Sequence, residues 1–430
     1  MTDAISQLVD LFRRNRAGAR IGVYSVCSAH PVVIAAALAL ARDRKQVAVI
    51  EATCNQVNHD GGYTGMRPAD FVALVHTAAR AVGFPLQHLI LGGDHLGPQP
   101  WRHLVAEVAM AKAEQMVDAY VRAGFSKIHL DCSMRCADDP DILAEATIAE
   151  RAARLAAAAE RAADGIGSTP LYIIGTEVPA PGGMGAGHAI EPTPADGVVE
   201  TWQTHAEAFS RHGLGKAFAR VAAIVVQPGL DFGNAEIVHF APAQARDLSA
   251  RLADLPGAVY EAHSTDYQQP AAYAALVDGH FAILKVGPAA TFALREALYA
   301  LEAIEEELPS SAGRSGLREA LEQAMLANPR DWASHYAGTA AEQTYLRHFS
   351  FSDRLRYYWT QPSVQEAVAR LLTNLGTRPL PLPLISQFLP QHMAAVQAGT
   401  LAGTAEALCL ANVKRALVPY ADACGQHLAA

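Results

Sequence analysis

Residues 19–28, ARIGVYSVCS, are the first of eight short apolar runs, rich in β-forming residues, that decide the fold of this 430-residue chain. The other seven are KQVAVIEAT (45–53), HLILGGDH (88–95), SKIHLDCS (126–133), PLYIIGTEV (170–178), AAIVVQPG (222–229), GAVYEAHST (257–265) and FAILKVGPA (281–289). Alanine-rich stretches with apolar residues at helical spacing separate them. This alternation predicts a parallel sheet closed into a (β/α)8 TIM barrel, an α/β fold.

The strand pattern stops near residue 308, and the rest of the chain has the pattern of helices alone. A single barrel needs about 250 residues. We therefore expect a barrel over 1–308 and a helical extension over 309–430 that packs on it. Two connections, 54–66 and the Gly- and Pro-rich 179–197, are longer than a barrel requires. Both follow the C-terminal end of a strand, so we expect them to lie over the barrel mouth.

Composition limits the class of protein. Hydrophobic residues make up 51% of the chain and charged residues 18%, enough for a large buried core. A net charge of −9 argues against nucleic acid or an anionic membrane as a partner. The N-terminus lacks a signal-peptide core, and the longest apolar stretch, 31–41, is too short to span a bilayer. We expect a cytoplasmic protein whose six cysteines are reduced.

Each apolar run ends in polar or charged residues. In chain order these are Ser25, Ser28, Glu51, Asp94, His95, Asp131, Glu177, Gln227, Glu261, His263 and Lys285. The C-terminal ends of barrel strands converge on one face, where barrel enzymes place their active sites. The run ends therefore predict the position of the chemistry.

Asp94 and His95 are the strongest pair among them. As neighbours on one strand end, they could face the barrel axis and the loop respectively, and Gly92 and Gly93 would let a substrate or metal approach the backbone. The alternative is a structural hydrogen bond between Asp94 and His95 in a turn.

Several of the remaining side chains suit a divalent cation. His95, Glu177 and His263 would supply mixed nitrogen and oxygen ligands, although each alone could be a polar residue of the core. The carboxylates of Glu51, Asp131 and Glu261 make the same rim acidic. Such a rim requires a cation, protonation of some members, or sugar hydroxyls as partners.

Lys285 has three interpretations: it pairs with the acids, holds a phosphate, or forms a Schiff base. The first two are favoured, because Gly287 and a helix starting near Ala290 offer backbone N–H groups to an anion. The candidate substrate-binding residues are Ser28, Asn55, Glu261, Asp266, Lys285 and Gly287. Arg354, Arg356 and Tyr357 could also reach an anion, although a solvated helix face is the commoner explanation for them.

Long motifs resemble one known family over nearly the whole chain. They are YSVCSAHP (24–31), EATCNQVNHDGGYTG (51–65), LGGDHLGP (91–98), AGFSKIHLDCSM (123–134), GTEVPAPGG (175–183), VVQPGLDF (225–232), YEAHSTDYQ (260–268), ILKVGPAATFALREA (283–297) and SDRLRYYW (352–359). These motifs resemble the Z-type subunits of class II tagatose-bisphosphate aldolases. Members are also labelled tagatose 6-phosphate kinases, but this sequence lacks a Walker-type phosphate loop.

The resemblance implies roles for several residues. Asp94 is similar to a proton-donating acid and His95 to a zinc ligand of the catalytic class II aldolases, with Glu177 and His263 in two further ligand segments. Where another zinc histidine would stand, this chain has Gln227, a poorer zinc ligand. The predicted metal set is His95, Glu177, Gln227 and His263, for Zn²⁺ or alternatively Mn²⁺ or Mg²⁺. The predicted catalytic set is Asp94, Glu51 and Asp131.

Two functional hypotheses follow. The first is a metal-dependent enzyme acting at C3–C4 of a ketohexose phosphate, which interconverts tagatose 6-phosphate and fructose 6-phosphate by retro-aldol and aldol steps or by deprotonation and reprotonation. The second, which is how the family is usually described, is a non-catalytic subunit that supports the activity and stability of a separate aldolase chain. The expected partners are a ketohexose or its phosphate, such an aldolase subunit, and further copies of this chain.

Overall fold

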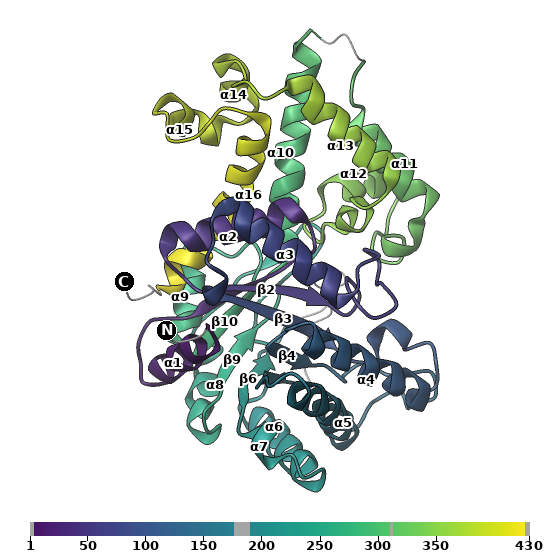
Figure 1. Cartoon of the computed structure of the whole chain (residues 1–430), viewed down its shortest axis with the longest axis vertical. Helices are drawn as coiled ribbons and strands as arrows, with labels where there is room; N and C mark the ends of the chain where they lie inside the picture. Colours follow the sequence, from purple (N-terminus) through teal and green to yellow (C-terminus); the bar gives the residue numbers. More distant parts are fainter. Residues whose placement is uncertain (1–3, 176–189, 310–312, 426–430) are drawn as a thin grey trace.

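The structure, a computed structural model, describes residues 4–175, 190–309 and 313–425. Eight parallel strands close into a barrel in the order β1-β10-β9-β6-β5-β4-β3-β2 (Figure 1). They are β1 (Val23–Cys27), β2 (Ala48–Thr53), β3 (Leu89–Leu96), β4 (Lys127–Leu130), β5 (Leu171–Ile174), β6 (Val221–Val226), β9 (Val259–Ala262) and β10 (Phe281–Val286). The predicted TIM barrel is confirmed.

Helices follow the strands around the outside of the barrel. They are α2 (Pro31–Arg44), α3 (Pro68–Val82), α4 (Ala106–Arg122), α5 (Glu145–Asp164), α6 (Ala195–Arg211), α7 (Gly215–Phe218), α8 (Arg246–Ala250), α9 (Pro270–Asp278) and α10 (Pro288–Glu307), with α1 (Ala4–Arg16) before the first strand. Several of them, such as α2 and α10, begin with proline, whose fixed φ suits the first helical position. The helices bury alanine-rich faces against strands that are buried along almost their whole length.

The connection from β6 to β9 departs from simple alternation. It contains an antiparallel pair, β7 (Asp231–Phe232) and β8 (Ile237–Val238), before the short helix α8. The sequence pattern did not predict this pair, because two-residue strands are too short to show a period of two.

The chain after α10 is helical within the described residues. It forms α11 (Leu317–Ala327), α12 (Ala340–Phe349), α13 (Pro362–Leu375), α14 (Leu382–Phe388), α15 (Met393–Gln397) and α16 (Ala405–Cys424). Figure 1 shows α11 to α15 gathered at one end of the molecule, with α10 and α16 running between them and the barrel. The boundary between two domains at residue 308 stays a prediction.

The last helix anchors this extension to the barrel. α16 packs against α2, α9 and α10. The phenol of Tyr420 donates to the Thr265 carbonyl at 2.9 Å, and Gly22 N–H donates to the Cys424 carbonyl at 2.9 Å. No described helix combines the length and apolar character needed to cross a bilayer.

Gly97, just after β3, sits where a side chain has no room. A Cβ atom there would lie 1.7 Å from the Asp131 carbonyl oxygen. We expect Gly97→Ala to lower the free energy of unfolding by about 3 kcal/mol, because two strand ends must move apart to relieve the overlap. Gly215→Ala is the matched control, since its Cβ would meet no atom within 4 Å. Denaturant unfolding of both variants measures the difference, and equal stability would contradict this packing.

Candidate active site

A buried network of opposite charges lies inside the barrel. Lys127 Nζ is 2.8 Å from Glu51 Oε1 and 2.8 Å from Glu261 Oε2. Lys285 Nζ contacts the Glu51 carboxylate and lies 2.8 Å from Asp94 Oδ2. With Asp131, four buried carboxylates face two buried ammonium groups. The carboxylates therefore outnumber the ammonium groups, and the histidines beside them supply the other nearby groups that can carry positive charge.

The two lysines keep these acids ionised despite their burial. Burial raises the pKa of Glu51, but the Lys127 and Lys285 ammonium groups outweigh it, so the net pKa is lowered. Asp94 behaves likewise, with His95 and Lys285 holding its pKa well below the usual range against the effect of burial. Burial lowers the pKa of Lys285 while Asp94 and Glu51 raise it, and the net shift is well upward. Lys285, Glu51 and Asp94 are therefore all charged at neutral pH.

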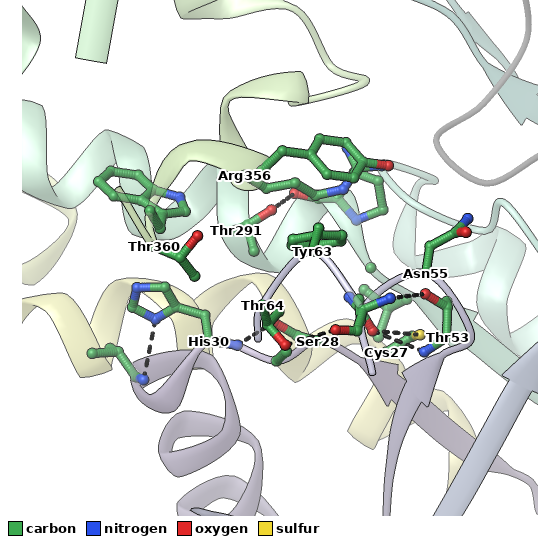
Figure 2. Close-up of a pocket in the computed structure, with 18 of the residues that line it drawn as sticks. Cys27, Ser28, His30, Thr53, Asn55, Tyr63, Thr64, Thr291, Arg356 and Thr360 are labelled. Carbon is green, nitrogen blue, oxygen red and sulfur yellow. Dashed lines mark hydrogen bonds between the residues drawn. The ribbon is translucent and has the colours of Figure 1, made fainter. Parts of the chain in front are cut away.

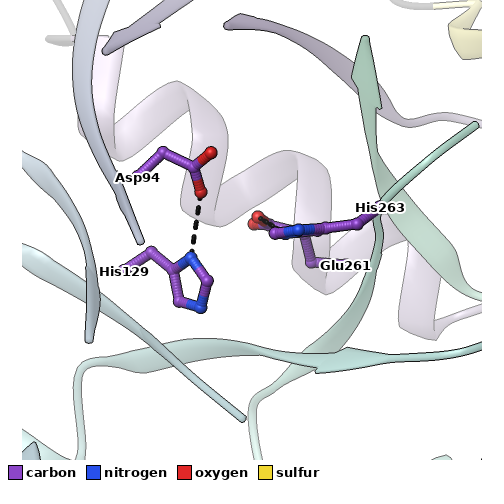
Figure 3. Close-up of side chains that lie close together, drawn as sticks. All are labelled: Asp94, His129, Glu261 and His263. Carbon is purple, nitrogen blue, oxygen red and sulfur yellow. Dashed lines mark hydrogen bonds and ion pairs between the residues drawn. The ribbon is translucent and has the colours of Figure 1, made fainter. Parts of the chain in front are cut away.

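Two acids of this network, Asp94 and Glu261, also lie beside two histidines. One nitrogen or oxygen atom from each of Asp94, His129, Glu261 and His263 lies within 4.8 Å of the others (Figure 3). His129 Nδ1 is 2.9 Å from Asp94 Oδ1, and His263 Nε2 is 2.9 Å from Glu261 Oε1. The Nε2 atom of His129 is buried and has no hydrogen-bond partner within the described chain.

His95 reaches the same cluster through an unusual backbone. Its φ of 50° is left-handed, and the β3–β4 register shifts between Gly93 and Leu96. This turn brings the His95 ring to 5.0 Å from the His263 ring instead of toward the loop. Such strain in a residue other than glycine is common at functional sites.

Asp131 orients the His95 ring. Its Oδ2 atom is 2.7 Å from His95 Nδ1, while its Oδ1 accepts a hydrogen bond from Ser133 N–H at 3.0 Å. Burial lowers the pKa of His95, but Asp94 and Asp131 raise it more. A carboxylate bound to one ring nitrogen leaves the other free to meet a cation, the arrangement found around metal-bound histidines.

These residues fit a divalent metal ion. Burial lowers the pKa of His263 to about 4, so its ring is neutral at neutral pH, as a metal ligand must be. The Nε2 atom of His129, which has no hydrogen-bond partner within the described chain, and the excess of carboxylates also suit a bound cation. Imidazole and carboxylate together suit Zn²⁺, and also Mn²⁺.

Two members of the cluster, Asp94 and His263, line a cavity of about 470 Å³. Figure 2 shows other residues of its lining. Asp94, His95, His263 and Lys285 lie at its barrel end, and Tyr63 and Thr64 come from the loop after β2. The helical extension contributes another wall with Arg356, Tyr357, Trp359 and residues of α13. The cavity is therefore shared between the barrel mouth and the C-terminal extension.

The structure brings together part of the set predicted from the sequence. Those that line the cavity are Ser28, Asn55, Asp94, His95, His263, Asp266, Lys285 and Gly287. Glu51, Asp131 and Glu261 lie deeper, where they contact the lysines and histidines. Glu177 lies outside the described residues, as does most of the predicted loop 179–197.

Gln227 makes hydrogen bonds within its own turn. Its side-chain oxygen accepts hydrogen bonds from the backbone N–H groups of Gly229 at 2.9 Å and Leu230 at 3.1 Å. The side-chain oxygen of Gln227, the atom that would bind a metal, is therefore already hydrogen-bonded to the backbone. Its role as a ligand stays a prediction.

Gly92 and Gly93 serve a different purpose from the predicted approach of a ligand. A Cβ on Gly92 would lie 2.5 Å from Glu51 Oε1, and one on Gly93 would lie 2.5 Å from a methyl carbon of Leu96. The glycines thus make room for neighbouring side chains, and the Gly92 position allows Glu51 to reach Lys127 and Lys285.

The N-terminus of α10 is filled by a carboxylate of the chain itself. Asp266 Oδ1 accepts hydrogen bonds from Gly287 N–H at 3.1 Å and Ala289 N–H at 2.8 Å. Lys285, whose pairing with acids was one of three interpretations, contacts Glu51 and Asp94. The backbone groups near Gly287 are therefore engaged by Asp266.

Asp266 makes stability depend on pH. Burial raises its pKa to about 6, against the backbone hydrogen bonds that lower it. The folded state therefore holds a proton that the unfolded state releases, so stability is lost as pH rises from about 4 to about 6. We expect Asp266→Asn to remove roughly 2 kcal/mol of this loss. Urea unfolding of both proteins at pH 4.5 and pH 7.5 measures this. If the free energy of unfolding of Asp266→Asn fell between these pH values as much as that of the unaltered protein, the expectation would be contradicted.

Lys127 and His129 were missed in the sequence analysis. Both lie in the run SKIHLDCS, of which only Asp131 was selected. Positions 127, 129 and 131 alternate along one strand, so their side chains share a face. A period of two counted back from Asp131 would have found them.

The chain is similar to one protein family and to several solved structures. The family model of GatZ/KbaZ-like D-tagatose-1,6-bisphosphate aldolase subunits matches residues 8–425. A crystal structure described as a probable tagatose 6 phosphate kinase from Sinorhizobium meliloti 1021 is 49% identical, with a TM-score of 0.87, over 94% of this chain and 100% of that one. The YdjI aldolase of Escherichia coli K12 is 11% identical with a TM-score of 0.40, over 83% of this chain and 94% of that one.

Proposed function

Since this chain belongs to the family of GatZ/KbaZ-like D-tagatose-1,6-bisphosphate aldolase subunits, we propose that it is itself a metal-dependent enzyme of carbohydrate metabolism. The proposed reaction is the 4-epimerisation of a ketohexose phosphate, tagatose 6-phosphate to fructose 6-phosphate, by cleavage and re-formation of the C3–C4 bond. The observation that supports it is the buried cluster of Asp94, His129, Glu261 and His263, with His95 beside it, on the floor of the cavity.

His129, Glu261 and His263, with His95 beside them, would hold the ion, and this mixed set of imidazole and carboxylate suits Zn²⁺. When bound, it would supply Lewis-acid polarisation of the C2 carbonyl, next to the carbon that carries the breaking bond. Glu51, Lys127 and Glu261 hold the floor of the site through short ion pairs. This pre-organisation keeps charged groups fixed while charge develops in the substrate.

Asp94 is the group that would move the proton. It lines the cavity, and it belongs to the cluster of side chains at the barrel end, where it could reach a substrate hydroxyl. Taking the proton of the C4 hydroxyl turns C4 into an aldehyde as the C3–C4 bond breaks. After the aldehyde rotates, addition of C3 to its other face and return of the proton to oxygen give the C4 epimer.

The test uses the purified chain alone with Zn²⁺, Mn²⁺ or Mg²⁺ and either tagatose 6-phosphate or fructose 6-phosphate. Interconversion, followed by chromatography or proton NMR, is expected, and a chelator should remove it. Because only the configuration at C4 changes, a carbon-13 label should stay at its original carbon. Absence of turnover with every metal would refute the proposal.

A second function is favoured by the family description, which names an aldolase subunit. In that case the chain would support a separate catalytic aldolase without turning over substrate itself. The same assay separates the two functions: activity that appears only after a catalytic class II aldolase chain is added would establish the supporting role. Size-exclusion chromatography of the mixture would then show a complex of both chains.

A further inference from the structure

Arg356 stands out among the groups that line the cavity. Its guanidinium donates to the carbonyl oxygens of Ser352 and Asp353 and, at 3.1 Å, to the Tyr357 phenol. Within the described residues no carboxylate lies within ion-pair distance of it. The other strong cation of the cavity, Lys285, is by contrast committed to two acids. Among the described residues that line the cavity, Arg356 is therefore a cation without a carboxylate partner.

The surroundings of Arg356 fix its position. Its guanidinium lies 4.6 Å from the centre of the Tyr357 ring, which in turn lies 4.7 Å from the Tyr63 ring. The turn before it is held to α10, because Thr291 donates to Asp353 Oδ2 at 2.5 Å. Figure 2 shows Arg356 across the cavity from Cys27 and Thr53, which belong to the strand ends. A rigid guanidinium there is suited to an anionic group at the far end of an extended sugar.

The usual phosphate position of a barrel is closed here. Barrels often bind phosphate at the loop and helix that follow the last strand, which in this chain are Gly287 and the N-terminus of α10. Asp266 already accepts hydrogen bonds from Gly287 N–H and Ala289 N–H. A phosphate there would have to displace a buried carboxylate or lie against its negative charge.

We propose that Arg356 binds the phosphate of a ketohexose monophosphate and that Asp266 excludes a second phosphate from the α10 N-terminus. The inference rests on the proposed function for the class of sugar, but it concerns binding and not turnover. The site would accept one phosphate, at the end of the sugar remote from the metal cluster. Arg356 and Asp266 are specificity-determining residues in this assignment.

Calorimetric titration of the purified protein with fructose 6-phosphate, fructose and fructose 1,6-bisphosphate tests it without requiring turnover. We expect the monophosphate to bind most tightly. Arg356→Gln should weaken its binding by about 10- to 100-fold, the usual effect of losing a charged hydrogen-bond donor, and leave fructose unchanged. Arg356→Lys should retain part of the affinity. Arg330→Gln, an exposed change in the same extension, is the matched control.

Asp266→Ala should raise the affinity for the bisphosphate, by up to about 10-fold, because it frees the N–H groups of α10. Equal losses for fructose and its monophosphate in Arg356→Gln, or a bisphosphate that binds the unaltered protein as tightly as the monophosphate, would overturn the inference. So would a ketohexuronate that binds more tightly than the monophosphate through Arg356. Selective binding without epimerisation would leave this inference standing and refute only the proposed function.

Discussion

Replacing His263 with alanine is expected to lower kcat/KM for epimerisation by about 10³-fold or more and to remove the bound metal. The ring is neutral and buried between Glu261 and His95, so it is available as a ligand without first losing a proton. Loss of one ligand weakens both metal binding and the polarisation that the metal supplies. His95→Ala is expected to have the same effect, since Asp131 orients its ring toward the cluster.

The measurement is metal content by mass spectrometry together with steady-state kinetics at a fixed, saturating metal concentration. His103→Ala is the matched control, because His103 is exposed and outside the cavity. Thermal unfolding of each variant shows whether the fold persists. A folded His263→Ala protein that keeps both its metal and its activity would contradict the assignment of this cluster.

The barrel could be predicted from sequence because its signal is repeated. Eight apolar runs separated by amphipathic stretches leave few topologies, and right-handed crossovers reduce these further. The β7–β8 pair, by contrast, depends on a contact between residues 231–232 and 237–238 that has no periodic trace. Local pattern predicts elements that repeat, and it fails where a few residues pair on their own.

The site could be predicted only in part, for a similar reason. Asp94, His95 and His263 end their strands in polar motifs, and the structure places all three at the cavity. Lys127 is a single lysine within an apolar run, and nothing else in that run indicates its partners. Its role becomes visible only when β2, β4 and β9 close around it and bring Glu51 and Glu261 within 2.8 Å.

Asp266 shows what sequence reasoning lacks at this level. It was selected as a substrate-binding residue, and it does line the cavity. Its two hydrogen bonds to the start of α10, however, join it to residues 21 and 23 positions further along the chain. No spacing rule predicts that a carboxylate from one loop will fill the anion position of the next, so the phosphate side of the site had to be inferred from the structure.

Removing Lys127 should cause a large loss of stability. Its side chain is 1% exposed and lies between two fully buried glutamates. Burial lowers the pKa of Lys127, but Glu261 and Glu51 raise it more, so it is charged. Lys127→Met would leave both carboxylates without this partner, and breaking a buried pair in this way costs about 3–5 kcal/mol.

The effect should grow with pH. Without the ammonium, burial would raise the pKa of Glu51 and Glu261 above their unfolded values. Folding would then favour their protonated forms, so stability is lost as pH rises above about 4.5. Denaturant unfolding at pH 5 and pH 8 should therefore show the larger deficit at pH 8. Lys112→Met, which removes a lysine from a partly exposed pair with Asp60, is the control.

A double variant separates lost charge from lost packing. Lys127→Met with Glu261→Gln removes one of the two acids left without their lysine and should recover part of the stability, since the neutral amide needs no counter-charge. If methionine failed mainly because its shape does not fit, the second change would recover nothing and the deficit would not vary with pH. Either result would contradict the view that charge balance holds the floor of this site together.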